Sequence, residues 1–293
     1  MCKRRREYVR ALADSLLSEL SSEQQYAMEL AQERGASNWL TSLPIHEHGF
    51  SLHKGAFRDA LALRYGWLPT GTPVECSCGK PFSVEHSLSC SMGGFPTLRH
   101  NEVRDFTASL MSEVCSGVSI EPGLQQLNGE QFTGASAIRE DGARLDLAAN
   151  GFWGANRERA FFDVRVFNPY APSNRQSASM SSTYRMHERV KKRQYSQRIQ
   201  EVEHGTFTPL VMSLTGGLGR EATVCYKRLA SLLAVKWDQP YSVTMGWLRC
   251  SLSYSLLRSS IRCLRGARSS CGRVVGLGAA TPPVDLICLE ARV

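Results

Sequence analysis

The sequence has no run of about 18 uninterrupted apolar residues, so we expect no segment that spans a membrane. It also shows no internal repeat at the periods of solenoid proteins. No apolar stretch follows the first residues, Met-Cys-Lys-Arg-Arg-Arg, as it would in a secretory signal. Charged residues make up 21% and hydrophobic residues 42% of the 293 residues, which excludes a disordered composition. We therefore expect a globular chain with one large domain or two modest ones.

Positive charge is in excess, with a net charge of +8 and a pI near 9.1. A clustered excess of arginine and lysine indicates a polyanionic partner such as nucleic acid. The basic stretch at residues 3–6 fits either a nuclear-import or phosphate-binding patch or a solvated helix start. The ten cysteines are scattered, which favours a reducing compartment with mostly free thiols. We expect a nuclear protein, with the cytoplasm as the alternative.

Four potential zinc ligands lie within fifteen residues: Cys76, Cys78, His86 and Cys90. Three thiolates and one imidazole form a common structural zinc set, and Gly79 supplies a tight turn after the first pair. The Cys-x-Cys pair is tighter than the usual Cys-x-x-Cys. The sequence predicts a zinc knuckle here, and the alternative is three buried thiols with a surface histidine.

Hydrophobic periodicity predicts helices at residues 3–34, 54–65, 99–114, 221–237 and 243–265. We expect a break at Ser21, which can cap a new helix. The helix over residues 54–65 should turn Phe57 and Leu61 inward and end at Gly66. Short strands are expected at residues 118–121 and 207–213.

Two apolar segments each carry one aspartate, Asp146 in residues 144–148 and Asp163 in residues 161–166. Because side chains alternate along a strand, each aspartate points away from its apolar neighbours. A hairpin of the two strands brings both carboxylates to one side of a sheet, where they could hold Mg²⁺. The alternative is two ordinary strands whose aspartates are solvated or paired with arginine.

A basic helix is predicted at residues 184–203, with Tyr184, Tyr195 and Ile199 on its buried stripe. Lys191 lies near the centre of that stripe, and a buried lysine is costly unless it meets a carboxylate or an anion. Lys192 lies at the edge of the stripe. The other basic side chains are expected to face solvent, where they can meet phosphates: Arg185, Arg189, Arg193 and Arg198. A Gly-rich loop at residues 215–219 matches neither a P-loop nor a dinucleotide-binding fingerprint.

From residue 99 the expected order is helix, three strands, helix, strand. That α-β-β-β-α-β order resembles the mixed-sheet core of restriction-endonuclease-like PD-(D/E)xK nucleases. From Cys76 to Tyr195 the chain resembles the endonuclease region at the C-terminus of site-specific non-LTR retrotransposon proteins. The knuckle is followed by Arg99-His100-Asn101, Arg144-Leu145-Asp146, Asp163, Lys191 and Tyr195. The chain departs from the family pattern at Leu145, which replaces a proline, and at Arg165, where many nucleases have lysine.

The resemblance implies an α/β fold and a metal-dependent endonuclease that nicks DNA to prime reverse transcription. Asp146 and Asp163 would hold Mg²⁺, helped by the carbonyl of Val164 and by Glu121 or Glu102. Lys191 would act on the attacking water or the phosphate, and Arg165 could share this role. Zinc would be structural. Residues implied in DNA contact are Arg99, His100, Arg185, Arg189, Lys192, Arg193, Tyr195 and Arg198.

The expected organisation is a helical region (1–70), the knuckle (71–98), the nuclease core (99–240), a C-terminal helix (241–266) and a tail (267–293). DNA is the expected partner, and the resemblance adds element RNA and a reverse transcriptase as further partners. Two alternatives remain open. One is a catalytically inactive module that binds nucleic acid, and the other is an α/β protein with incidental cysteines.

Overall fold

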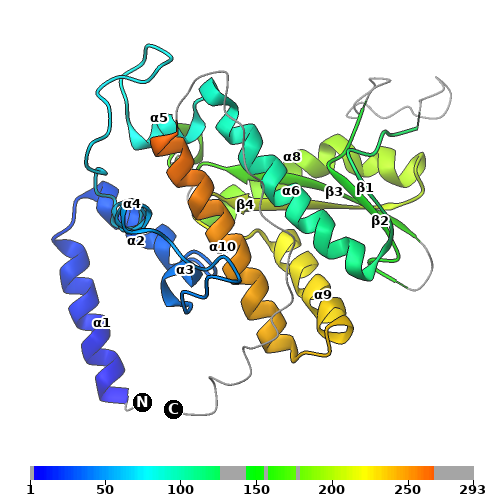
Figure 1. The fold of residues 1–293 in the computed structure, drawn as a ribbon, viewed down its shortest axis with the longest axis horizontal. Helices are drawn as coiled ribbons and strands as arrows, with labels where there is room; N and C mark the ends of the chain where they lie inside the picture. The colour runs from blue at the N-terminus through cyan, green and yellow to red at the C-terminus, as the bar shows by residue number, and fades with distance from the viewer. Residues whose placement is uncertain (1–2, 126–142, 155–157, 176–178, 267–293) are drawn as a thin grey trace.

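The computed structural model describes residues 3–125, 143–154, 158–175 and 179–266. The tail predicted at residues 267–293 lies outside this part of the chain. The described residues form a mixed α/β structure in which helices cover a four-stranded sheet (Figure 1). No helix in the described ranges is both long and apolar enough to cross a bilayer.

The sheet has the order β1-β2-β3-β4. The first three strands are antiparallel neighbours, and β4 runs parallel to β3. The helix α6 (Phe95–Val114) precedes β1, and α8 (Met180–Glu201) connects β3 to β4, so the expected α-β-β-β-α-β order is present. The strands are β1 (Ser116–Ile120), β2 (Leu147–Asn150), β3 (Arg159–Phe167) and β4 (Thr206–Ser213).

Alternation along the strands divides their side chains between two cores. On one face, Leu147, Phe162 and Val164 join the main core with α6, α9 (Arg220–Lys236) and α10 (Tyr241–Arg265). On the other face, residues of β2 and β3 pack against α8; they are Ala148 and Phe161, in contact with Tyr195 and Ile199. This confirms the predicted face of Phe162 and Val164 and the buried stripe of the basic helix. Leu145 was expected on the same face as Leu147, but it packs in the second core because it lies before β2 begins.

The amino-terminal helices follow the sequence signals closely. Residues 3–34 split into α1 (Lys3–Ser18) and α2 (Ser22–Gln32), and Ser21 forms a capping box with Gln24 as expected. Gly66 ends α4 (Lys54–Tyr65) in the left-handed conformation with φ 65°. The remaining short helices are α3 (Asn38–Thr41), α5 (Val84–Ser89), η1 (Met92–Gly94) and α7 (Pro172–Arg175).

The inward face of α4 differs from the prediction. Phe57 is 41% exposed, while Ala56, Asp59 and Ala60 are buried. Asp59 is buried because it receives two hydrogen bonds from Arg265 at the end of α10, which draws that side of α4 inward. An ion pair between helices therefore overrides the hydrophobic pattern.

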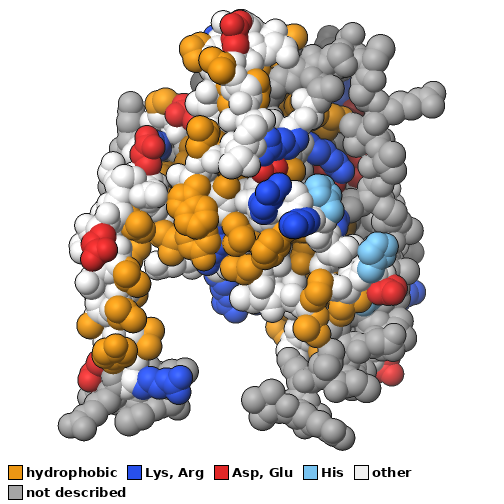
Figure 2. All heavy atoms as spheres, turned by 60° about the vertical axis from the view of Figure 1, so that its left-hand side comes forward, with side chains coloured by type: hydrophobic (Ala, Val, Ile, Leu, Met, Phe, Trp, Pro, Cys, Tyr) orange, Lys and Arg blue, Asp and Glu red, His pale blue; other side chains and the backbone are white. Residues whose placement is uncertain are grey.

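The helix α1 carries a row of exposed apolar side chains. Tyr8, Val9, Leu12 and Leu16 are all 48% exposed or more. Figure 2 shows hydrophobic side chains at the surface along this helix, which projects from the body of the molecule in Figure 1. The predicted break at Ser21 thus separates a packed helix from one with an uncovered apolar face.

Candidate functional site

The four predicted zinc ligands converge at one place. Their ligand atoms all lie within 4.8 Å of one another, so Cys76, Cys78, His86 and Cys90 could together hold a metal ion. The Sγ atoms of Cys76 and Cys90 are 3.8 Å apart, and Cys78 Sγ is 3.2 Å from His86 Nε2. The described residues contain no other group of three or more metal-binding side chains this close.

Local backbone structure brings these residues together. A tight turn returns the chain after Cys76, with Gly79 at φ 80° and its N–H donating to the Cys76 carbonyl. Ser83 then caps α5, which presents His86 in its first turn, and Cys90 ends the helix. All four ligands are therefore positioned by one turn and one short helix.

Electrostatics within the cluster favour a thiolate on one cysteine. Burial opposes ionisation of Cys76, but hydrogen bonds from the Cys78 backbone and from the side chains of His86, Cys78 and Cys90 lower its pKa to about 6. Burial instead raises the pKa of Cys90. Because the thiolate is the form that binds metal, Cys76 is prepared to act as a ligand at neutral pH.

The second cluster joins both predicted aspartates to the buried lysine. Lys191 Nζ lies 2.9 Å from Asp163 Oδ2 and 3.2 Å from Asp163 Oδ1. Asp146 Oδ1 lies 3.0 Å from His100 Nε2, and Asp146 Oδ2 accepts a 2.6 Å hydrogen bond from the Val164 N–H. Residues from α6, the start of β2, β3 and α8 therefore meet in one carboxylate site.

The position of Asp146 follows from where β2 begins. Pairing of β2 with β3 extends to Leu147 and Phe162, and one more residue in this register would place Asp146 opposite Asp163. The pairing stops there, and the side chain of Asp146 accepts the Val164 N–H instead. The carboxylate thus replaces a strand partner at the end of the ladder. Asp146 was expected within the strand and lies just before it.

Burial dominates the chemistry of this site. The Asp163 side chain is only 6% exposed, and its pKa is raised to about 6. Burial is the main cause; Lys191 opposes it and the charge of Asp146 adds to it. Tyr195 covers the site from α8, with Lys191 Nζ 5.7 Å from its ring centroid. Burial and the two nearby aspartates raise the pKa of Tyr195 to about 12, so its hydroxyl stays protonated.

The other residues suggested for catalysis have separate contacts. Glu121 follows β1, and its side chain is paired with Arg104, while its backbone N–H donates to the Asp146 carbonyl. Arg165 is exposed on β3. Burial of His187 lowers the pKa of its imidazole to about 4, and the charge of Arg165 is the second largest cause. Glu102 pairs with Arg262 of α10 at 3.3 Å. Its salt bridge thus connects α6 to α10.

Two basic residues expected at a DNA surface lie in the interior. Arg198 is 1% exposed and donates to the Gln125 carbonyl at 2.8 Å, so the expectation that it faces solvent is wrong. Arg99 is 4% exposed, and both of its terminal nitrogens lie 3.3 Å from the Leu88 carbonyl at the end of α5. Arg99 therefore connects α6 to α5, the helix that carries one ligand of the cysteine cluster. The side chains that do face solvent on α8 are Arg185, Arg189 and Arg193, with Lys192 partly exposed and paired with Glu221.

Two contacts at the site were not predicted. His100 was expected to contact DNA, but it holds Asp146, and only the family motif drew attention to it. Asn168 was not predicted to have a role; its amide donates to the Glu85 carbonyl and the Ser89 hydroxyl, which connects the end of β3 to α5. Neither contact has a signature in local periodicity, because each joins elements far apart in the chain.

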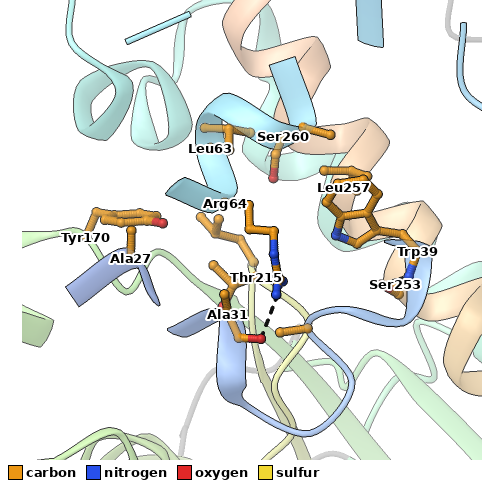
Figure 3. Close-up of a pocket in the computed structure, with 13 residues that line it drawn as sticks. Ala27, Ala31, Trp39, Leu63, Arg64, Tyr170, Thr215, Ser253, Leu257 and Ser260 are labelled. Atoms are coloured by element: carbon orange, nitrogen blue, oxygen red, sulfur yellow. Dashed lines mark hydrogen bonds between the residues drawn. The ribbon is translucent and has the colours of Figure 1, made fainter. Parts of the chain in front are cut away.

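A small cavity lies away from both clusters, between α2, α4 and α10 (Figure 3). It measures about 50 Å³, and Arg64 extends into it to reach the Ala31 carbonyl and the Ser37 hydroxyl. A space of this size holds a few water molecules at most. The carboxylate site and the cysteine cluster thus remain the functional candidates. No protein-family model matches this sequence, and no curated protein resembles it closely enough to count as a relative.

Proposed function

We propose that the chain is a Mg²⁺-dependent DNA endonuclease domain with a restriction-endonuclease-like core, derived from a non-LTR retrotransposon. One observation carries this proposal: Asp146, Asp163 and Lys191 meet at one site although they are up to 45 positions apart. Two acidic side chains suit a hard cation that activates water for phosphodiester hydrolysis, and a nearby lysine can stabilise charge on the phosphate.

The two carboxylates fit a hard divalent cation by their chemistry. Asp146 and Asp163 are oxygen acceptors close enough for the charge of one to raise the pKa of the other. Each carboxylate oxygen has a second lone pair beyond the contacts made by His100, Val164 and Lys191. A cation bound there would polarise the scissile phosphate and make a nearby water more acidic.

The chain's own groups have separate roles in this proposal. Lys191, held at Asp163, is placed to neutralise charge that develops on the phosphate or to orient the attacking water. His100 and the Val164 N–H fix the direction of the Asp146 carboxylate. Arg165 lies two residues beyond Asp163 on the same face of β3 and can contact a phosphate from the exposed side.

We assign zinc to the cysteine cluster. A tetrahedral ion with Zn–S bonds of about 2.3 Å separates two sulfur ligands by about 3.8 Å. The observed distance between the Cys76 and Cys90 sulfurs is 3.8 Å. The ion would hold α5 in place, and α5 in turn accepts the hydrogen bonds of Arg99 and Asn168. Zinc therefore supports the core without taking part in the reaction.

DNA would lie along the exposed side of α8. Arg185, Arg189 and Arg193 recur at intervals of about one helical turn on this surface and are exposed. Such arginines contact phosphates, which sets the position of the duplex but carries little sequence information. The net charge of +8 adds long-range attraction.

Nicking of supercoiled plasmid tests the catalytic proposal. Wild-type protein should convert plasmid to the open circular form only with Mg²⁺, and Asp163→Ala or Asp146→Ala should remove this activity. Asp14→Ala, on the exposed surface of α1, is the matched control for loss of one acidic side chain and should nick normally. Equal nicking rates for Asp163→Ala and the wild type would contradict this mechanism.

A second function is favoured by one observation. Both carboxylates already have partners, Lys191 and His100, and the position two residues after Asp163 is arginine instead of lysine. These features suit a module that keeps the fold and binds nucleic acid without cutting it. DNA binding that needs no Mg²⁺, with no nicking by the wild type, would support this function over the endonuclease.

A further inference from the structure

A second pocket, of about 290 Å³, lies on the side of the molecule where the α2–α3 turn meets the β4–α9 loop and α10. Its walls include Arg34 from the turn, Gly216 and Gly217 from the loop, and Arg249 from α10. None of these residues belongs to the carboxylate site or the cysteine cluster. The pocket is several times larger than the cavity at Arg64.

Close backbone packing fixes the shape of this pocket. Gly35 and Gly216 have φ values of 107° and 104°, and a Cβ on Gly35 would lie 2.8 Å from the Gly216 carbonyl oxygen. A Cβ on Gly217 would lie 2.3 Å from the Glu33 carboxylate. The two loops therefore meet through glycines, and substitution would push them apart. Arg34 and Arg249 both line the pocket that these loops shape.

The two guanidinium groups are not neutralised by acidic side chains. None of the ion pairs in the described part of the chain involves Arg34 or Arg249. Partial burial and the nearby charge of Arg34 lower the pKa of Arg249, while Tyr241 acts against this. Two like charges that line one pocket repel each other, and an anion bound between them would relieve this repulsion.

Other charged groups near the pocket are already engaged. Glu33 lines it, but its carboxylate accepts hydrogen bonds from Tyr184 and Ser213, and burial raises its pKa. The amino-terminal N–H of Glu221 in α9 donates to Glu188, so the helix start is not available to bind a phosphate. The Gly-rich loop therefore contributes shape and close packing, and the arginines contribute the positive charge.

We propose that this pocket binds a phosphate group through Arg34 and Arg249. Guanidinium groups match phosphate oxygens in geometry and charge, and two of them that line one pocket can both contact one phosphate. The phosphate could be free in solution or part of a nucleic-acid backbone. This site is independent of the carboxylate site and does not require that the chain cut DNA.

Binding of two probes tests the proposal: inorganic phosphate by calorimetry, and a short DNA duplex by fluorescence anisotropy. The test variant is Arg34→Gln with Arg249→Gln. Its control is Arg10→Gln with Arg58→Gln, which removes the same charge from two exposed arginines outside the pocket. We expect the test variant to lose about tenfold or more in affinity for at least one probe, because each contact to a charged group is lost. The control should change affinity by no more than about twofold.

The probe for which the test variant loses affinity identifies the source of the phosphate. If DNA is bound, the slope of log affinity against log salt concentration should also become shallower by about one unit for each phosphate contact removed. Glu33→Gln provides a test of opposite sign, because removing its negative charge should strengthen phosphate binding while its hydrogen bonds are kept. Equal affinities of the test and control variants for both probes would overturn the proposal, provided that thermal unfolding shows both to be folded.

Discussion

The cysteine cluster and the carboxylate site are built in different ways. Cys76, Cys78, His86 and Cys90 come from fifteen consecutive residues held by one turn and one short helix. The carboxylate site draws on α6, β2, β3 and α8, and its side chains are joined by the Lys191–Asp163 and His100–Asp146 contacts. A site built from neighbouring residues can form as soon as its turn and short helix form. A distributed site forms only when the sheet and both helices are in place.

The first prediction tests whether the local site supports the distributed one. Cys78→Ser should abolish binding of about one zinc per chain, measured by elemental analysis. Zinc binding in small structural sites contributes about 10 kcal/mol or more, so α5 should lose its fixed structure. Because Arg99 and Asn168 both donate to α5, the unfolding temperature of the whole protein should fall. A zinc-free variant with unchanged melting would show that the two regions are independent.

The second prediction concerns the helix that carries Lys191. Arg198→Met should lower the free energy of unfolding by about 2 kcal/mol, since it removes a buried charged donor from the Gln125 carbonyl. The control, Arg193→Met, changes an exposed residue of the same helix and should shift stability by about 0.5 kcal/mol or less. For DNA affinity the larger effect should come from the other substitution: Arg193→Met should bind DNA more weakly than Arg198→Met. Urea unfolding and anisotropy measure the two effects, and the same order in both assays would contradict the assignment.

The third prediction uses the titration of Asp163. Its pKa is about 6 in the folded protein against 3.8 ordinarily, so the folded state binds more protons between these values. The contribution of Asp163 to the free energy of unfolding is therefore present at low pH and is lost as pH rises through about 6. As pH rises from about 5 to about 7.5 in Mg²⁺-free buffer, the free energy of unfolding of the wild type should fall by about 1.4 kcal/mol relative to that of Asp163→Asn. Urea unfolding across this range checks the difference, and parallel curves for the two proteins would contradict it.

The sequence predicted the parts of the fold that depend on local pattern. The break at Ser21, the end of α4 at Gly66 and the strand carrying Asp163 all follow from capping, turn preference and alternation. Lys191 was identified as a buried lysine that needs a carboxylate, and the structure supplies Asp163. These predictions succeeded because the relevant partner is either nearby in sequence or required by a strong energetic rule.

The predictions that failed depend on long-range partners. Arg198 was assigned to solvent because of its charge, although it lies three residues after Tyr195 at the edge of the buried stripe, and the Gln125 carbonyl that accepts its hydrogen bond is 73 positions away. Phe57 was expected in the core, but the pairing of Asp59 with Arg265 turns α4 differently. A single sequence carries no sign of these contacts, because arginine and aspartate are usually found at the surface.

The hydrogen bond from the Val164 N–H to Asp146 makes one backbone proton a direct reporter of the carboxylate site. Its exchange with solvent deuterium depends on whether Asp146 remains an acceptor in that orientation. A cation or phosphate that rotates the carboxylate should speed exchange at this single amide while the neighbouring β3 amides stay protected. Occupancy of the site can then be followed on the backbone, without measuring any cleavage.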